Sequence, residues 1–182
     1  MPIITCKGKN RTAKVARECV DKGFCSTKNM YYYGVKLHLL AFYRKGTIPF
    51  PNKICFSAAS ENDLSVVKEL QWLDDQYDTE IFADKIYIDK DCFKPRQKCL
   101  QLELFTPVKA IKGTPECLKQ RDLAYNNIFS TAVSKVRQPV ESFFNWIIEK
   151  SNIQNASKVR SSKGLWLHCF GKLAIACLNW IF

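Results

Sequence analysis

The chain has 182 residues, of which 47% are hydrophobic and 13% aromatic, and its net charge is +11. This length and composition allow one compact domain with a hydrophobic core, and they exclude an intrinsically disordered chain. A basic excess of this size favours a polyanionic partner, nucleic acid first and an anionic membrane second. Charge alone is equally compatible with a basic but inert surface.

Cysteine usage points to reduced thiols in a cytosolic protein. The nine cysteines include no CxxC pair, and with two histidines in the chain a zinc cluster has little support. The residues after Met1, PIITCKGKN, do not form the apolar run of a secretory signal. The apolar stretch near the C-terminus is interrupted by Lys172 and Asn179, so we expect no membrane span.

The first 30 residues are basic, and we expect them to be irregular. Residues 1–36 hold eight Lys or Arg against two acids, Glu18 and Asp21. Thr12 to Val20 could form a helix, because Thr12 can cap it. The segment could be an arm that contacts phosphates, but taken alone a solvated basic segment is the favoured interpretation.

A hairpin is predicted next. Tyr31 to Tyr43 is rich in aromatic and branched residues and predicts a strand, and Lys53 to Ser57 predicts its partner. Arg44 to Thr47 predicts a turn in which Gly46 takes a positive φ. His38 lies within the first strand, and we interpret it as structural.

The middle of the chain alternates between helix and strand patterns. Ser60 would cap the first helix, with Asp63 three residues on in a variant of the capping box. The predicted elements are a helix over Ser60–Gln76, a strand over Glu80–Ile88, a short helix over Asp89–Leu100 and a strand over Leu102–Val108. This alternation predicts an α/β sheet with helices on its faces.

The last third is predicted to be mostly helical. Pro139 fits best in the first turn of a helix, so we expect a new helix or a kinked continuation there, with Glu141 in its first turn. The predicted segments are a basic loop over Lys109–Pro115, helices over Glu116–Lys135 and Gln138–Lys150, and a final apolar helix over Leu165–Phe182. We find no linker, and expect one domain over residues 1–182.

Two carboxylates are candidates for a metal site. Asp84 is expected at the end of a strand and Glu141 on a helix packed against the same sheet, which could together hold the Mg²⁺ ions of a phosphodiester-cleaving site. The basic residues expected to receive phosphates are Lys85, Lys109, Lys112, Arg137 and Lys150. From spacing alone a simpler interpretation is favoured, in which Asp84 only ends a strand and Glu141 forms a weak surface bridge with Arg137.

Three stretches of the sequence favour the metal site over the simpler interpretation. Tyr33–His38 reads YGVKLH, Ala83–Tyr87 reads ADKIY, and Arg137 is followed by Glu141 with three residues between them. In this order they resemble the Y-G-x-K-x-H, A-D-K-G-Y and R-x-x-x-E motifs of bacterial insertion-sequence transposases with a DDE site. The resemblance covers nearly the whole chain, from about residue 2 to residue 180.

The resemblance implies an RNase H-like mixed sheet flanked by helices. It also implies Mg²⁺-dependent, or Mn²⁺-dependent, strand cleavage and transfer at transposon ends, with Asp84 as the second acid and Glu141 as the third. The implied partners are double-stranded DNA, as transposon ends and target, and a second copy of the chain when active. The implied location is the bacterial cytoplasm, at the nucleoid.

The chain also departs from the family pattern. Ile86 stands where the family often has Gly, Ser134 replaces a Tyr, and Ile148 replaces a Lys, with Lys150 only nearby. The family's first acid belongs to an Asp-Ser pair that ends the first strand, and Met1–Thr5 resembles the residues just after that pair. We therefore expect a truncated transposase that lacks the first strand's acid and the N-terminal DNA-binding region, and that is inactive alone.

Other functions stay open. The chain could be a non-catalytic DNA-binding remnant, or a competitor of a full-length transposase. It could also be an unrelated metal-dependent nuclease with a similar sheet. A zinc or thiol-based role has the least support.

Overall fold

The computed structural model describes residues 1–9, 12–69, 72–88, 99–109 and 113–181. By its internal contacts the chain divides into two compact units, and each is described by itself. Unit 1 comprises Met1–Phe42, Pro49–Asn62 and Ser142–Phe182, and unit 2 comprises Tyr43–Ile48 and Asp63–Glu141.

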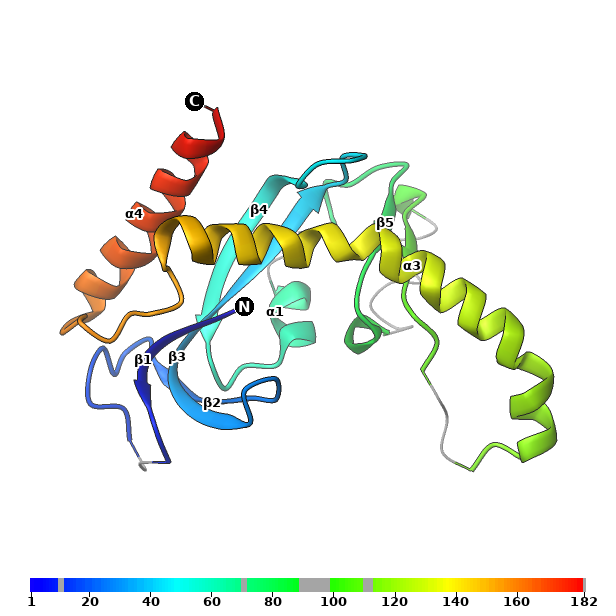
Figure 1. Cartoon of the computed structure of the whole chain (residues 1–182), viewed down its shortest axis with the longest axis horizontal. Coiled ribbons are helices and arrows are strands. Elements are labelled where there is room, and N and C mark those ends of the chain that lie inside the picture. Colours follow the sequence, from blue (N-terminus) through cyan, green and yellow to red (C-terminus); the bar gives the residue numbers. More distant parts are fainter. Residues whose placement is uncertain (10–11, 70–71, 89–98, 110–112, 182) are drawn as a thin grey trace. The chain divides into compact units, whose positions relative to one another are not determined.

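Unit 1 is built on a sheet around one long strand, β3 (Met30–Phe42). The strands β1 (Pro2–Lys7) and β2 (Asp21–Cys25) flank its first half, and β4 (Phe50–Ala58) pairs with its second half, all antiparallel (Figure 1). Aromatic and branched residues fill β3, as suits a pleated and largely buried strand. The hairpin predicted for β3 and β4 is confirmed, and Gly46 in its turn has φ of 74°.

Gly34 allows β1 to lie tightly against β3. A Cβ atom at this position would lie 1.9 Å from the backbone oxygen of Ile3. Only glycine, which has no Cβ, fits here without moving the strand. The YGVKLH stretch therefore contains its glycine for a packing reason.

The core of unit 1 also includes α4 (Ser162–Ile181) and the end of α3 (Glu116–Ser151). Phe56 of β4 contacts two aromatic rings of α4, with ring centroids 5.8 Å from Trp166 and 5.2 Å from Phe170. The fully buried side chains of this core include Ile3, Val35, Phe143, Ile147, Leu165 and Cys169. The final helix predicted from the sequence is confirmed.

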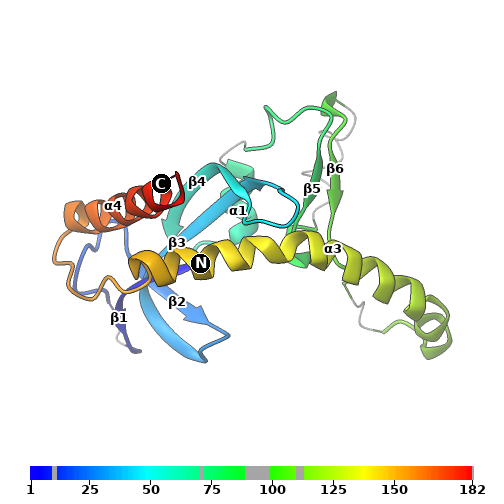
Figure 2. The same cartoon turned by 45° about the horizontal axis from the view of Figure 1, so that its top comes forward.

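Apart from its part of α3, unit 2 has only short helices and strands. It contains α1 (Asp63–Glu69), the 3₁₀ turn η1 (Lys85–Tyr87) and two strands of three residues each, β5 (Glu80–Phe82) and β6 (Glu103–Phe105). The strands β5 and β6 are parallel and lie side by side (Figure 2). Leu73 and Leu102 form their core with Leu64, Val67, Ile81, Leu100 and Leu104.

One long helix, α3 (Glu116–Ser151), contributes to both units. Pro139 lies inside it, although proline has no N–H to donate to the carbonyl of Lys135. The prediction of a continuing helix is confirmed and that of a new one is wrong. Glu141 is therefore in a helix interior, so the predicted first-turn dipole stabilisation does not apply.

Several predicted boundaries are wrong. Thr12–Val20 forms turns and bends instead of a helix, and Ala16 has φ of 51°, which a right-handed helix cannot contain. The irregular segment predicted over residues 1–30 contains β1 and β2. The strands over Glu80–Ile88 and Leu102–Val108 are each only three residues long.

The helix predicted over Ser60–Gln76 begins at Asp63 and is described only to Glu69. Because α1 begins three residues after Ser60, Ser60 is not at the capping position, and that prediction is wrong. Asp63 lies in the first turn of α1, where a negative charge is favoured. Most of the helix predicted over Asp89–Leu100 lies outside the described residues. The predicted α/β class is confirmed, and its RNase H-like form stays a prediction. In the described residues, no helix has the length and apolar character needed to cross a membrane.

Candidate functional site

Asp84 lies at the carboxyl end of β5. The N–H of Ala83 donates to the carbonyl of Phe105 at 2.9 Å, so the parallel pairing reaches the residue just before Asp84. The Asp84 carboxylate then caps η1, with its Oδ1 accepting from the N–H of Lys85 at 2.7 Å. A carboxylate has about four acceptor positions, so this one bond leaves capacity for a metal ion. The side chain is exposed.

Tyr87 places a hydroxyl close to two acids. Burial first, and then the charges of Asp63 and Asp84, raise the pKa of Tyr87 to about 12. The hydroxyl therefore stays protonated at neutral pH and can donate a hydrogen bond. The sequence shows Tyr87 only as part of a motif, because the packing of α1 against η1 is what brings Asp63 near it.

Glu141 forms an ion pair on α3. Its Oε1 lies 2.9 Å from a terminal nitrogen of Arg137, one turn earlier. Glu141 is 58% exposed and Arg137 is 28% exposed, so the pair is screened by water and contributes little to stability. The Nε of Arg137 is buried without a hydrogen-bond partner, which leaves a donor for an incoming acceptor.

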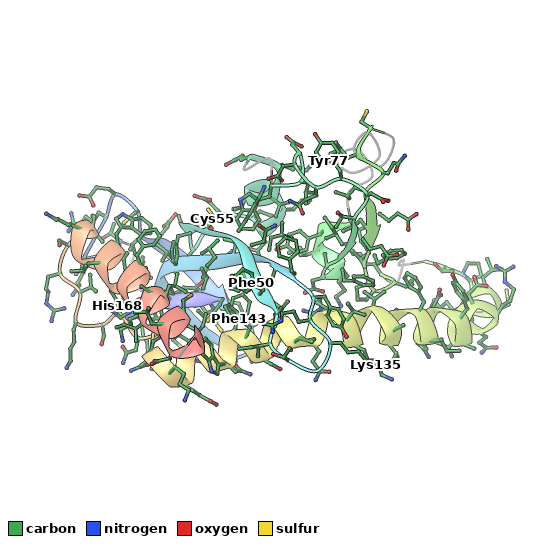
Figure 3. All side chains as sticks on the ribbon, turned by 90° about the horizontal axis from the view of Figure 1, so that it is seen from above. Phe50, Cys55, Tyr77, Lys135, Phe143 and His168 are labelled. Carbon is green, nitrogen blue, oxygen red and sulfur yellow. The ribbon has the colours of Figure 1, made fainter. Side chains whose placement is uncertain are left out.

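A polar groove runs along the same face of α3. It has a volume of about 670 Å³. Its lining residues are Asn127, Ser130, Thr131, Ser134, Lys135, Arg137, Gln138 and Glu141. They are all polar and most recur every three or four positions in the sequence, the spacing of residues on one helix face. Lys135 is labelled in Figure 3.

The helix that carries Glu141 packs on the strand beside Asp84. The ring centroids of Phe105 in β6 and Phe129 in α3 are 6.4 Å apart. The N–H of Val108 donates to the hydroxyl of Ser130 at 3.0 Å. Both predicted acids therefore belong to unit 2, on neighbouring elements.

Contacts join only some of the predicted site residues. Arg137 is joined to Glu141 by an ion pair, whereas no hydrogen bond or ion pair in the described ranges joins Asp84 to Glu141. In those ranges no group of three or more His, Cys, Asp or Glu side chains could hold a metal ion. Carboxylate oxygens nevertheless suit Mg²⁺, which takes one or two protein carboxylates and completes its shell with water and phosphate.

The predicted phosphate-binding residues fall in three places. Lys85 follows Asp84 directly, and Lys109 follows β6; both are exposed. Lys150 is exposed near the end of α3 and belongs to unit 1. Lys112 lies outside the described residues.

His38 is buried in the sheet of unit 1. Its Nε2 lies 2.9 Å from the hydroxyl of Ser57.

Three cysteine thiols have a raised pKa. Burial raises the pKa of Cys19 and of Cys55, and it raises the pKa of Cys169 to about 12. None of these three thiols is activated as a nucleophile.

No family model matches the chain, and neither a curated protein nor a solved structure matches it. The resemblance to DDE transposases stays a prediction that rests on the three motifs.

Proposed function

We propose that the chain is the catalytic domain of a DDE transposase, with an RNase H-like arrangement of its sheet. The observation that carries the proposal is the setting of the two motif acids. Asp84 ends a strand of a parallel pair, and Glu141 lies on the helix that packs against the neighbouring strand. Ligands bind beyond the carboxyl ends of parallel strands in many α/β proteins.

In this proposal Asp84 and Glu141 hold the metal ions. Mg²⁺, when bound, supplies Lewis-acid stabilisation of the attacking and leaving oxygens of a phosphodiester. A cation on Glu141 would compete with Arg137 for the carboxylate, and the guanidinium could then neutralise a phosphate. Lys85 and Lys109 add positive charge around the same DNA strand.

The central test is strand nicking with Mg²⁺ or Mn²⁺. The substrate is duplex DNA carrying the sequences that flank the coding region of this chain. It is offered to the chain with and without an Asp-Ser segment joined before Met1, because the family pattern has its first acid in such a pair. Asp84→Asn keeps a capping oxygen and Glu141→Gln keeps the side-chain shape, so each removes charge with little structural change. We expect each to reduce nicking at least about a hundredfold, as the loss of a metal ligand does.

Glu149→Gln is the matched control, because Glu149 is an exposed acid on the same helix. It should nick like the unaltered chain. Nicking that survives Asp84→Asn would remove Asp84 from the site. Cleavage of arbitrary DNA without strand joining would indicate a metal-dependent nuclease instead.

A second candidate function is DNA binding without cleavage. The charge distribution favours it: unit 1 holds fourteen Lys or Arg against four Asp or Glu, a net charge of +10, while unit 2 holds fourteen against thirteen, a net charge of +1. The basic surface that attracts DNA is therefore concentrated outside the unit that holds both acids. Salt-dependent binding that is unchanged by Glu141→Gln, with no nicking in any condition, would support it.

A further inference from the structure

An open aromatic pair lies at the β2 end of the sheet in unit 1. Phe24 and Tyr31 are direct cross-strand partners in the register of β2 and β3. Their ring centroids are 5.0 Å apart, with an angle of 56° between the planes. Phe24 is 52% exposed and Tyr31 is 39% exposed, so large parts of both rings face solvent.

Phe24 and Tyr31 lie where this part of the sheet ends. Tyr32 is buried in the core, with Cys25 and Met30 packed beside it. Successive side chains of a strand point to opposite faces, so Tyr31 lies on the other face of β3, which carries the buried Tyr33 and Val35 farther along the strand. Tyr31 is the second residue of β3 and Phe24 the last but one of β2, and there both rings are only partly covered.

Two lysines surround the pair. The Nζ of Lys22 lies 4.8 Å from the centroid of the Tyr31 ring, and the Nζ of Lys9 lies 5.8 Å from it. Lys9 is brought there by a bend at Gly8, which has φ of 129° and donates its N–H to the carbonyl of Tyr31 at 3.1 Å. Both contacts are cation–π interactions at an exposed site.

The charge around the pair is also strongly positive. Unit 1 has a net charge of +10. The acid nearest in sequence, Asp21, is already bound: its carboxylate accepts from the N–H of Lys22 at 2.7 Å, and a hydrogen bond with Ser60 lowers the pKa of Asp21. Asp21 therefore keeps its negative charge, and the attraction for an anion comes from the excess of Lys and Arg over the four acids of unit 1.

We propose that Phe24, Tyr31, Lys9 and Lys22 form a binding site for single-stranded nucleic acid. An unpaired base stacks on the open rings, and the lysine ammonium groups move from the Tyr31 ring to the flanking phosphates. Flexible four-carbon stems allow that exchange, which keeps each ammonium beside a negative group. Stacking on exposed aromatic side chains between basic residues is a general way to bind single strands.

The chemistry favours a single strand over the other polyanions. In a duplex the base faces are covered by neighbouring bases, so they cannot reach the rings. An acidic peptide would use the lysines and leave the rings without a partner. The proposal is independent of the metal site, since it concerns residues of unit 1 and needs no cleavage.

Binding is tested with the full chain and a fluorescent oligo-dT of about twelve nucleotides, a length within the usual site size. Phe24→Leu and Tyr31→Leu keep an apolar side chain and remove the flat ring. We expect each to weaken binding about tenfold, the typical loss of one stacking contact. Lys22→Gln should lower the slope of log K against log salt by about 0.7, as for one lost phosphate contact on a single strand.

Tyr77→Leu is the matched control. Tyr77 is 67% exposed, but it lies in the sequence between acids, with Asp75 and Asp78 close by (Tyr77 is labelled in Figure 3). This change should leave binding within about twofold. Circular dichroism of each variant checks that the sheet is intact.

An abasic oligonucleotide of the same length separates stacking from charge. Phe24→Leu should not weaken its binding, because it has phosphates and no bases. The proposal is overturned if both ring variants bind oligo-dT like the unaltered chain, or if they lose affinity equally for the abasic strand or for a duplex. Polyglutamate that binds the chain as tightly as oligo-dT does would instead indicate an acidic protein partner.

Discussion

The two units contain equal numbers of basic residues and differ in their acids. Each holds fourteen Lys or Arg, but unit 1 has four Asp or Glu and unit 2 has thirteen. A surface that attracts DNA needs an excess of positive charge, whereas a site that holds Mg²⁺ needs carboxylates. Under the proposed function, unit 1 would supply affinity for DNA and unit 2 would supply the metal ligands.

The units also differ in how they are held together. In unit 1 the strand β3 has 13 residues and pairs with three others. In unit 2 the strands β5 and β6 have three residues each, and much of the packing comes from leucine side chains between α1 and the strands. Unit 1 should therefore be the more cooperative of the two.

The largest effect on the free energy of unfolding is expected from truncating one buried side chain in the core of either unit. Phe143→Ala removes a buried ring from unit 1 and should cost about 3–5 kcal/mol, and Leu102→Ala in unit 2 should cost about 2–5 kcal/mol. Hydrogen exchange can show which amides lose protection. We expect Phe143→Ala to expose the amides of β1, β3 and β4, and to leave those of β5 and β6 unchanged. Equal loss in both units would show that they unfold as one.

The next effect tests the tight contact of β1 with β3. Gly34→Ala places a Cβ against the backbone of Ile3, so the strand must move, and we expect a loss of about 3 kcal/mol in the free energy of unfolding. Urea denaturation measures it. Gly171→Ala is the control, because nothing lies within 4 Å of its added Cβ and alanine favours the helix by about 1 kcal/mol. A Gly34→Ala variant as stable as the unaltered chain would contradict the close approach.

A smaller effect should appear in unit 2 at alkaline pH. The folded structure raises the pKa of Tyr87 from 10.0 to about 12. Between these values the folded protein keeps a proton that the unfolded chain has lost, so the free energy of unfolding falls as pH rises. The loss should reach about 2 kcal/mol across that interval. Denaturation from pH 9 to pH 12 measures it, and Tyr87→Phe should abolish this part of the loss. An equally steep loss in Tyr87→Phe would assign it to other groups.

The smallest effect is expected from Glu141. Its pair with Arg137 is exposed and spans one helical turn, so Glu141→Gln should change the free energy of unfolding by less than about 0.5 kcal/mol. Chemical denaturation next to Glu149→Gln measures it. A small value shows that any loss of nicking in Glu141→Gln comes from lost chemistry. A loss of several kcal/mol would make Glu141 a structural residue.

Elements whose signals are local could be predicted from the residues alone. The aromatic and branched run after Met30 predicted β3, and the apolar run before the C-terminus predicted α4. The turn at Gly46 followed from the residue that a positive φ requires. The acids Asp84 and Glu141 and the pair Arg137–Glu141 were also visible as residue types at fixed spacings.

Strands and side-chain positions that depend on residues distant in the sequence became clear only in the folded chain. The strand β2 has little β propensity of its own and exists because β3 offers it a pairing edge. The strand before Asp84 is short because β6 pairs with it over three residues, after which the carboxylate caps a 3₁₀ turn. Phe24 lies opposite Tyr31 because of the register in which β2 pairs with β3. Hydrogen bonds between the strands set that register, and residue spacing in the sequence does not reveal it.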